Sequence, residues 1–97
     1  MDDEETLQAL KGVYDPEIGI NIVDLGLVYR AVRTPNEIEV AITMTTPSCP
    51  LGEMLLEEAR QILHARFPDT ASIRVGLVWD PPWSAERMSE QARQQFG

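Results

Sequence analysis

The only cysteine of the chain lies at a position that suits a reactive thiol better than a thiol that merely packs in the core. Cys49 lies between Pro47 and Pro50, where an alternating segment gives way to one with helical spacing. Pro50 suits the first position of a helix, so we expect Cys49 at or beside the N-cap. The unpaired N–H groups and the positive end of the helix dipole favour a thiolate there, although Glu53 partly opposes this. The pattern predicts a reactive thiol, and the alternative is an inert thiol that happens to begin a helix.

Carboxylates form a second group of candidates. Asp15 and Glu17 flank Pro16, and Asp24 precedes a Leu-Gly-Leu segment. Asp-Pro is typical of a turn or a helix stop, and that interpretation stays open beside a role in a site. The only histidine, His64, falls on the polar side of a predicted helix. The sequence contains no CxxC, P-loop or Rossmann fingerprint and certifies no Ser-His-Asp or Cys-His arrangement.

Two tryptophans form a third group. Trp79 and Trp83 flank Asp80-Pro81-Pro82, and a diproline can continue neither a strand nor a helix. The segment is either a stiff corner buried in the core or an exposed partner surface, because aromatic anchors dominate contact sites. Both interpretations remain open at this level.

Periodicity indicates the elements that position these residues. The segment DDEETLQALKGVYDP has apolar residues at helical spacing up to Val13, with Asp15-Pro16 as the stop. Alternation predicts three strands, and helical spacing predicts a second and a third helix. In chain order the later elements are the strands LGLVYRAVR and EIEVAITMT joined by Thr34-Pro35-Asn36, a helix from Leu51 to about Phe67-Pro68, a strand over Ser72–Trp79 and a helix from Ser84.

Two details of these elements can be checked directly. In the second strand the alternation places Thr43 on the polar face with Glu37 and Glu39. In the last helix Ser84 is the expected N-cap, and Trp83 is expected to pack on Met88 as a hydrophobic staple. That helix would carry an apolar stripe of Met88, Ala92 and Phe96.

The order α-β-β-α-β-α predicts an α/β (α+β) fold, a two-layer sandwich with the helices on one face of the sheet. The length of 97 residues corresponds to a single domain over residues 1–97. A core of this size is often supplemented by oligomerisation, so we expect a homodimer.

The amino-acid composition limits the kinds of partner that we expect the chain to bind. Sixteen acidic against eight basic residues give a net charge of -8 without a basic block, so neither nucleic acid nor an anionic membrane is an expected partner. No apolar run approaches the roughly 20 residues of a membrane span. The N-terminus is acidic without a secretory leader pattern, and one cysteine cannot form an internal disulfide framework. These features predict a cytoplasmic protein.

Three ordered blocks resemble a known family. The blocks DPEIGINIVDLGLVY, MTTPSCPLGEML and VWDPPWSAERMSEQAR are similar to those of the small iron-sulfur cluster assembly proteins of the SufT and PaaD-like group. This group is related to the eukaryotic cytosolic iron-sulfur targeting component. The resemblance runs from about Thr6 to Phe96. It implies a fold like the C-terminal domain of NifU-type scaffolds and an accessory role in iron-sulfur protein maturation rather than an enzyme.

The resemblance also implies a site. It places Asp15, Glu17, Thr45 and Cys49 in one pocket, with Asp24 as a weaker member, and Cys49 as the contact to a metal, a cluster or a persulfide. Trp83 would be a supporting residue at most. The implied partners are the iron-sulfur assembly machinery and client apoproteins.

The chain departs from one branch of the group. PaaD-type subunits of multicomponent oxygenases carry a cysteine-rich C-terminal extension, whereas this sequence stops at Gly97 with one cysteine. A bound cluster commonly needs four cysteine ligands, so one monomer is not expected to hold one stably. We expect instead a transient contact with a cluster or with iron, or Cys49 from each of two subunits with exogenous thiols.

Two alternatives remain. The chain could be a small thiol enzyme with Cys49 as nucleophile and Asp15 or Glu17 as acid-base partner, or a PaaD-like oxygenase subunit. The enzyme interpretation lacks an evident base near pH 7, because His64 is expected on another face.

Overall fold

The predicted order of elements is confirmed in the computed structural model, which describes residues 3–15, 18–44 and 52–96. A short 3-10 helix, η1, is added between the last strand and the last helix. The elements are α1 (Glu4–Leu10), β1 (Val28–Arg33), β2 (Glu37–Ile42), α2 (Gly52–Arg66), β3 (Ser72–Leu77), η1 (Ala85–Arg87) and α3 (Glu90–Phe96).

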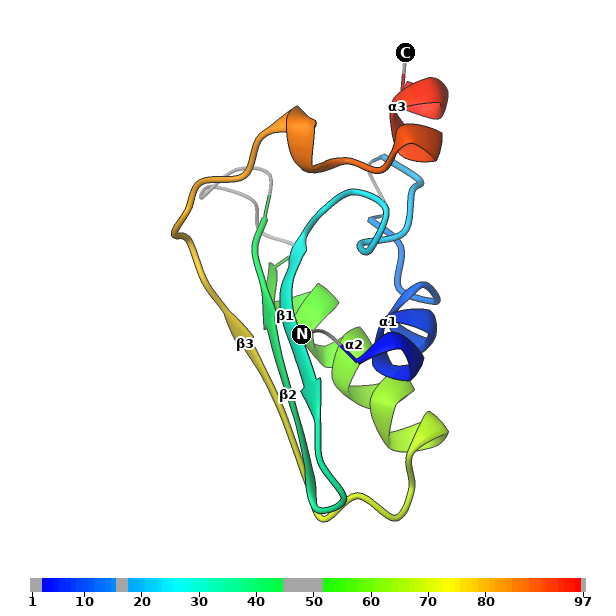
Figure 1. Cartoon of the computed structure of the whole chain (residues 1–97), viewed down its shortest axis with the longest axis vertical. Coiled ribbons are helices and arrows are strands. Elements are labelled where there is room, and N and C mark those ends of the chain that lie inside the picture. Colours follow the sequence, from blue (N-terminus) through cyan, green and yellow to red (C-terminus); the bar gives the residue numbers. More distant parts are fainter. Residues whose placement is uncertain (1–2, 16–17, 45–51, 97) are drawn as a thin grey trace.

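The three strands form one sheet in the order β1-β2-β3, which the sequence left undetermined. β1 and β2 are the expected antiparallel hairpin, and β3 runs parallel to β2. Ile38, Val40 and Ile42 of β2 are buried on the inner face. Figure 1 shows α1 and α2 on that one side of the sheet, which is the predicted two-layer arrangement.

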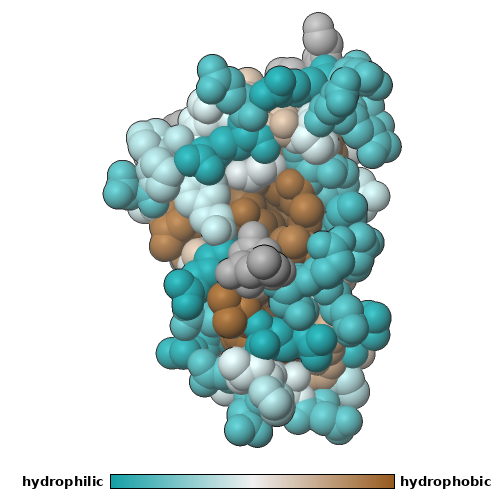
Figure 2. Space-filling model, in the orientation of Figure 1, coloured by the Kyte–Doolittle hydropathy of each residue, from teal (hydrophilic) through white to brown (hydrophobic). Residues whose placement is uncertain are grey.

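The second helix forms the main cover of the sheet. Leu55, Ala59 and Leu63 recur at helical spacing along α2 and are fully buried, whereas His64 is exposed as expected. The core reaches the surface in places. In Figure 2 hydrophobic residues gather in the middle of the face, and hydrophilic residues surround them.

The first helix is shorter than the sequence predicts. Asp3 caps it, because its Oδ2 accepts hydrogen bonds from Thr6 N (2.9 Å) and Thr6 Oγ1 (2.7 Å). The helix ends at Leu10, five residues before the expected stop. Val13 is buried outside the helix, where its carbonyl accepts a hydrogen bond from Ile22 N (2.9 Å). This bond to a later segment replaces the next helical turn.

All three strands are also shorter than predicted, and β2 ends at Ile42, three positions before its predicted end. β1 begins at Val28, because Leu25, Gly26 and Leu27 belong to the preceding turn, in which Gly26 has φ +78°. That backbone conformation favours glycine and ends the extended run. β3 ends at Leu77 rather than at Trp79.

The prediction of one continuous helix from Ser84 is wrong. Ser84 makes no side-chain capping bond, and the backbone is extended at Met88, which is buried. Ser89 N donates to the Asp24 carbonyl (2.7 Å), and Ser89 Oγ accepts from Ala92 N (3.1 Å). Tying the chain down at residues 88 and 89 interrupts the helix and makes Ser89 the true N-cap of α3.

Within the ranges that the structure describes, no helix combines the length and the apolar character needed to cross a membrane.

Candidate functional site

The candidate site lies where β1 begins and β2 ends, and we call this region the site end. It comprises the turn Asn21–Leu27, residues Thr43 and Met44, the start of α2 at Gly52, and the segment Trp83–Ser89. Three bonds hold these parts together. Thr43 N donates to Leu27 O (2.8 Å), Trp83 Nε1 donates to Leu25 O (2.7 Å) and Ser89 N donates to Asp24 O (2.7 Å).

Asp24 is fixed by its own turn. Asn21 Oδ1 accepts from Asp24 N (2.9 Å), while Asn21 Nδ2 donates to Asp24 Oδ2 (2.7 Å). Because Ser89 also binds the Asp24 carbonyl, both the backbone and the side chain of Asp24 have defined positions. Sequence analysis missed Asn21, although its spacing of three from Asp24 is typical of side-chain-closed turns.

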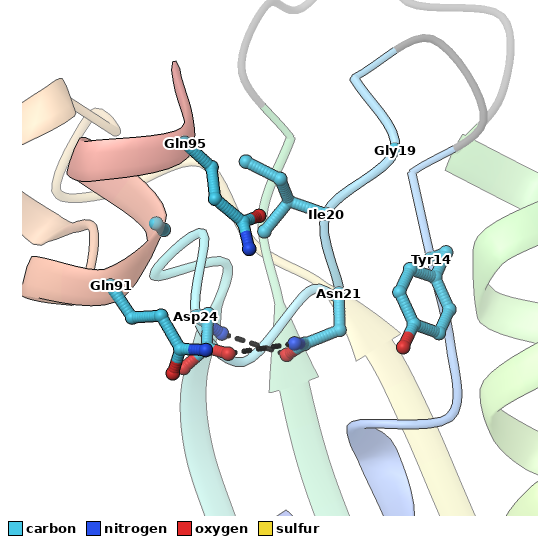
Figure 3. Close-up of a pocket in the computed structure, with 8 residues that line it drawn as sticks. Tyr14, Gly19, Ile20, Asn21, Asp24, Gln91 and Gln95 are labelled. Atoms are coloured by element: carbon cyan, nitrogen blue, oxygen red, sulfur yellow. Dashed lines mark hydrogen bonds between the residues drawn. The ribbon is translucent and has the colours of Figure 1, made fainter. Parts of the chain in front are cut away.

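Asp24 and Asn21 border an open hollow of about 220 Å³. Figure 3 shows Gln91 and Gln95 of α3 on one side of it and Tyr14 on the other. The lining residues are Tyr14, Gly19, Ile20, Asn21, Asp24, Gln91, Ala92 and Gln95. Amides, a hydroxyl and a carboxylate suit hydrogen bonding to a polar partner. In the described ranges, no three His, Cys, Asp or Glu side chains gather to hold a metal ion.

Asp15 is nearly fully buried, with 3% of its surface exposed. Its Oδ1 accepts from Ile18 N (3.2 Å), its carbonyl accepts from Gly19 N (2.7 Å), and its N–H donates to Ile20 O (3.1 Å). These bonds tie Asp15 to the segment 18–20. Asp15 therefore anchors the chain on the far side of residues 16–17, but it does not stop α1, which ends at Leu10.

Thr43 is a residue that the sequence pattern placed wrongly. Alternation assigned it to the polar face of β2, yet it is 1% exposed. Its hydroxyl has no hydrogen-bond partner in the part of the chain that the structure describes. A buried hydroxyl without a partner costs about 1–3 kcal/mol, so this group calls for an explanation.

Three predicted site residues lie outside the described residues. They are Glu17, Thr45 and Cys49, in the segments 16–17 and 45–51. The residues on either side of segment 45–51 are described, and they are neighbours. A Cβ added to Gly52 would lie 3.7 Å from Met44 Cγ. Both flanks of the cysteine segment therefore belong to the site end.

The two tryptophans differ in their surroundings. Trp83 is partly buried against the core and donates its indole N–H to Leu25 O. Trp79 is 43% exposed. Tyr29 of β1 supports the corner between Trp79 and Trp83, since its hydroxyl donates a hydrogen bond to Pro81 O (2.8 Å). The interpretation as a stiff corner fits Trp83, and the interpretation as a surface fits Trp79.

Known proteins resemble this chain in fold and in sequence. A crystal structure of a domain of unknown function from Bacillus anthracis superposes with a TM-score of 0.87 at 37% identity, covering 93% of this chain and 86% of that one. The fold is thus that of a small α/β domain found in bacteria. The family described as "Iron-sulfur cluster assembly protein" matches residues 3–76, and the chain belongs to this family.

Two curated relatives match over most of their length. The Fe-S protein maturation auxiliary factor YitW of Bacillus subtilis is 36% identical over 97% of this chain and 92% of its own length. The Fe-S protein maturation auxiliary factor SufT of Staphylococcus aureus is 38% identical over 88% of this chain and 97% of its own length. The resemblance to the SufT-like group is therefore confirmed.

Proposed function

We propose that this protein is an accessory factor in iron-sulfur cluster assembly and iron-sulfur protein maturation. The observation that carries the proposal is the family match over residues 3–76, joined to maturation factors that align over nearly their full length. The names of these relatives describe auxiliary factors, which favours a role without catalysis of its own.

Cys49 is the proposed point of contact with iron, with a cluster or with a persulfide. Soft thiolate is the ligand that iron-sulfur chemistry prefers. One cysteine per chain is too few for the usual four ligands, so the cluster is cargo held transiently. Curated relatives that include iron-sulfur cluster carrier proteins support a transient contact.

The described part of the site end would position that contact. Asp24 is held by Asn21 and Ser89, and the Gln side chains of α3 border the same hollow. These groups offer a fixed polar surface to a partner. We propose that the partners are the assembly machinery and client apoproteins, met in the cytoplasm.

Complementation tests the role of the thiol. In cells that lack this protein, Cys49→Ser at matched abundance should fail to restore the activity of an iron-sulfur client enzyme. The swap is nearly isosteric, but a serine hydroxyl does not ionise near neutral pH. Asp69→Asn, an exposed change near the β1–β2 hairpin, is the matched control and should rescue fully. Full rescue by Cys49→Ser would contradict the proposal and leave the surface around Trp79 and Trp83 as the better candidate.

A second substitution separates the charge of Asp15 from its structural hydrogen bonds. Asparagine keeps an Oδ1 acceptor for Ile18 N, so Asp15→Asn should preserve this bond and the fold while removing the charge. A milder loss of client activity than that of Cys49→Ser is expected if the carboxylate orients the site. Unchanged activity would restrict Asp15 to its structural hydrogen bonds.

Anaerobic reconstitution tests whether the cargo is transient. After incubation with iron and sulfide, the purified protein should retain well under one cluster per chain once desalted. Absorption spectra with iron and sulfide analysis measure this directly. A stoichiometric cluster that survives desalting would contradict transient binding.

A further inference from the structure

The two edges of the sheet are protected differently. At the β1 edge, Asp3 N donates to Ala31 O (2.7 Å), and the register of β1 shifts between Val28 and Arg30. The β2–β3 ladder runs without a shift from Glu37–Ser72 to Ile42–Leu77. In Figure 1 β3 lies at the outer edge of the sheet, and among the described elements none lies beyond it. A regular uncovered edge is a template for pairing with another strand.

The hydrogen bonds at the two ends of the ladder determine which groups face outward. Ser72 N donates to Asn36 O (3.2 Å), and Val78 N donates to Ile42 O (2.8 Å). In a parallel ladder alternate residues of a strand bond to the same neighbour. Residues 72, 74, 76 and 78 therefore bond toward β2. Ile73, Val75 and Leu77 direct their N–H and C=O groups toward the free edge.

We propose that this edge pairs with the same edge of a second copy of the chain. The two β3 strands run antiparallel around a two-fold axis at Val75, so that the two sheets join into one of six strands. Val75 then faces Val75 of the partner subunit, and Ile73 faces Leu77 of the partner subunit. The three outward-facing residues of each strand supply six interchain N–H···O=C bonds.

The charge of Arg74 and the small size of Gly76 favour this register over a shifted one. With Val75 on the axis, Arg74 faces Gly76 of the partner subunit. A shift of the axis to residue 74 would place Arg74 directly opposite Arg74 of the partner subunit, which is destabilising. Gly76 is exposed and has no side chain that would clash with the strand opposite.

Arg74 does not block the edge. Its guanidinium Nη2 lies 3.1 Å from Glu37 Oε1 and 3.0 Å from Glu39 Oε2, so the side chain extends back across β2. A lysine or arginine that projects past an edge strand would prevent pairing, whereas this one is held over its own sheet.

The inner side of the edge is apolar and incompletely covered. Ile73 and Leu77 are only partly buried within one chain, while Val75 between them is buried. In the proposed register Ile73 of each chain packs against Leu77 of the partner subunit across the two-fold axis. Such apolar cross-strand pairs stabilise a sheet.

The dimer should be weak. A single pair of six-residue strands buries less surface than the roughly 1,200 Å² or more of a stable interface. The net charge of -8 on each chain adds repulsion between the copies. We therefore expect weak, reversible association that rises with protein concentration.

Substitutions at Gly76 test the register. A Cβ added there meets nothing within 4 Å, so each variant should fold. Gly76→Glu places two carboxylates opposite the two partner arginines and should tighten the dimer, whereas Gly76→Lys should weaken it. Because each cross-strand pair occurs twice, we expect shifts of roughly 2- to 30-fold in the dissociation constant. Gly76→Ala is the matched control, and sedimentation in the presence of a reductant measures all four proteins.

Amide hydrogen exchange provides a second readout. On raising the protein concentration, the amides of Ile73, Val75 and Leu77 should become protected, while those of Arg74 and Gly76 should already be protected by β2. A strictly monomeric mass up to millimolar protein would overturn the proposal. A dimer whose dissociation constant does not change with the charge at position 76 would also overturn the proposal. A dimer in which the amides of Ile73, Val75 and Leu77 stay unprotected would overturn it as well. These outcomes do not depend on the function in iron-sulfur protein maturation.

Discussion

The two ends of the sheet are built from different kinds of contact. At the site end, Trp83 bonds to Leu25 and Ser89 bonds to Asp24, so segments about 60 residues apart meet. At the opposite end, which we call the hairpin end, the β1–β2 turn is closed locally by Thr34 N donating to Glu37 O (2.8 Å).

Charged side chains also contribute to the hairpin end. Arg33 lies 4.9 Å from the centroid of the Phe67 ring and 2.9 Å from Asp3 Oδ2, and Arg66 lies 5.4 Å from the same ring. These partners are exposed or half-exposed and each contributes little. Among the residues that the structure describes, the site end has one such contact, in which Arg87 lies 4.5 Å from the centroid of the Tyr29 ring, but its distant segments are joined by directional hydrogen bonds. We therefore expect single changes at the site end to have the larger effects.

The largest effect is expected for Gly26→Ala. The φ of +78° is strained for alanine, and the added Cβ would overlap the carbonyl of Arg87. Together these should lower the free energy of unfolding by about 3 kcal/mol or more. Gly19→Ala is the control, because Gly19 has φ +80° but an open surrounding, and it should cost only about 1–2 kcal/mol. Urea denaturation of both variants measures the difference, and equal losses would refute the close packing at Gly26.

A smaller effect is expected for Trp83→Phe. Phenylalanine keeps an aromatic ring, although a smaller one, but the Leu25 carbonyl loses the indole donor, which should cost about 1–3 kcal/mol. Trp79→Phe is the control and should change stability little, because Trp79 is half-exposed. Thermal unfolding of the pair decides this. Similar losses of stability for both variants would mean that side-chain packing, rather than the indole hydrogen bond, stabilises the corner.

At the hairpin end, Asp3→Ala should cost about 1 kcal/mol at pH 7 by removing the cap of α1. The hydrogen bond from Thr6 Oγ1, aided by Arg33 and partly offset by burial, lowers the pKa of Asp3 below its ordinary value of 3.8. The ionised form is therefore stabilised by folding, and its contribution is fully present above about pH 4. The difference between wild type and Asp3→Ala should shrink as the pH falls through the lowered pKa. A difference that stays constant down to pH 2 would contradict a role for the charge.

The smallest effect has the opposite sign. Thr43→Val replaces a buried hydroxyl that has no partner in the described part of the chain with a methyl group of similar size. Removing the unpaired hydroxyl is favourable, but the exchange of Thr for Val is not fully isosteric and offsets part of the gain, so stability should rise by about 0.5–1 kcal/mol. If Thr43 serves the site, the same variant should lose client activity in the complementation assay although it is more stable. A loss of stability on denaturation would show that the hydroxyl is satisfied in solution.

Much of the fold follows from local pattern. The alternation of β2 and the helical spacing of α2 are determined by which residues can share one apolar face. α2 has nearly the predicted bounds, and β2 begins at the predicted Glu37 but ends early, at Ile42. The turn Thr34-Pro35-Asn36 is too short for anything but a hairpin, which made β1 and β2 antiparallel neighbours. The family blocks likewise identified the group to which the chain belongs.

Part of the candidate site could be named but not arranged from sequence. Asp15, Asp24 and the tryptophans were singled out, yet only the structure separates a buried Asp15 that binds Ile18 N from an Asp24 that borders the hollow. Asn21 and the glutamines of α3 were missed, because polar residues in a loop and on a short helix carry no distinctive period. Glu17, Thr45 and Cys49 remain predictions.

What the sequence alone determined is the type and order of the elements, since these depend on spacing within a few residues. The tertiary structure decided where elements end and which side chains are buried. Val13 left the helical pattern because its carbonyl bonds to Ile22. α3 begins only at Glu90, because Asp24, 65 positions before Ser89, binds that N-cap residue. The parallel pairing that leaves the β3 edge open also depends on contacts between distant segments. No local pattern encodes such contacts, because their energy exists only once the chain has folded.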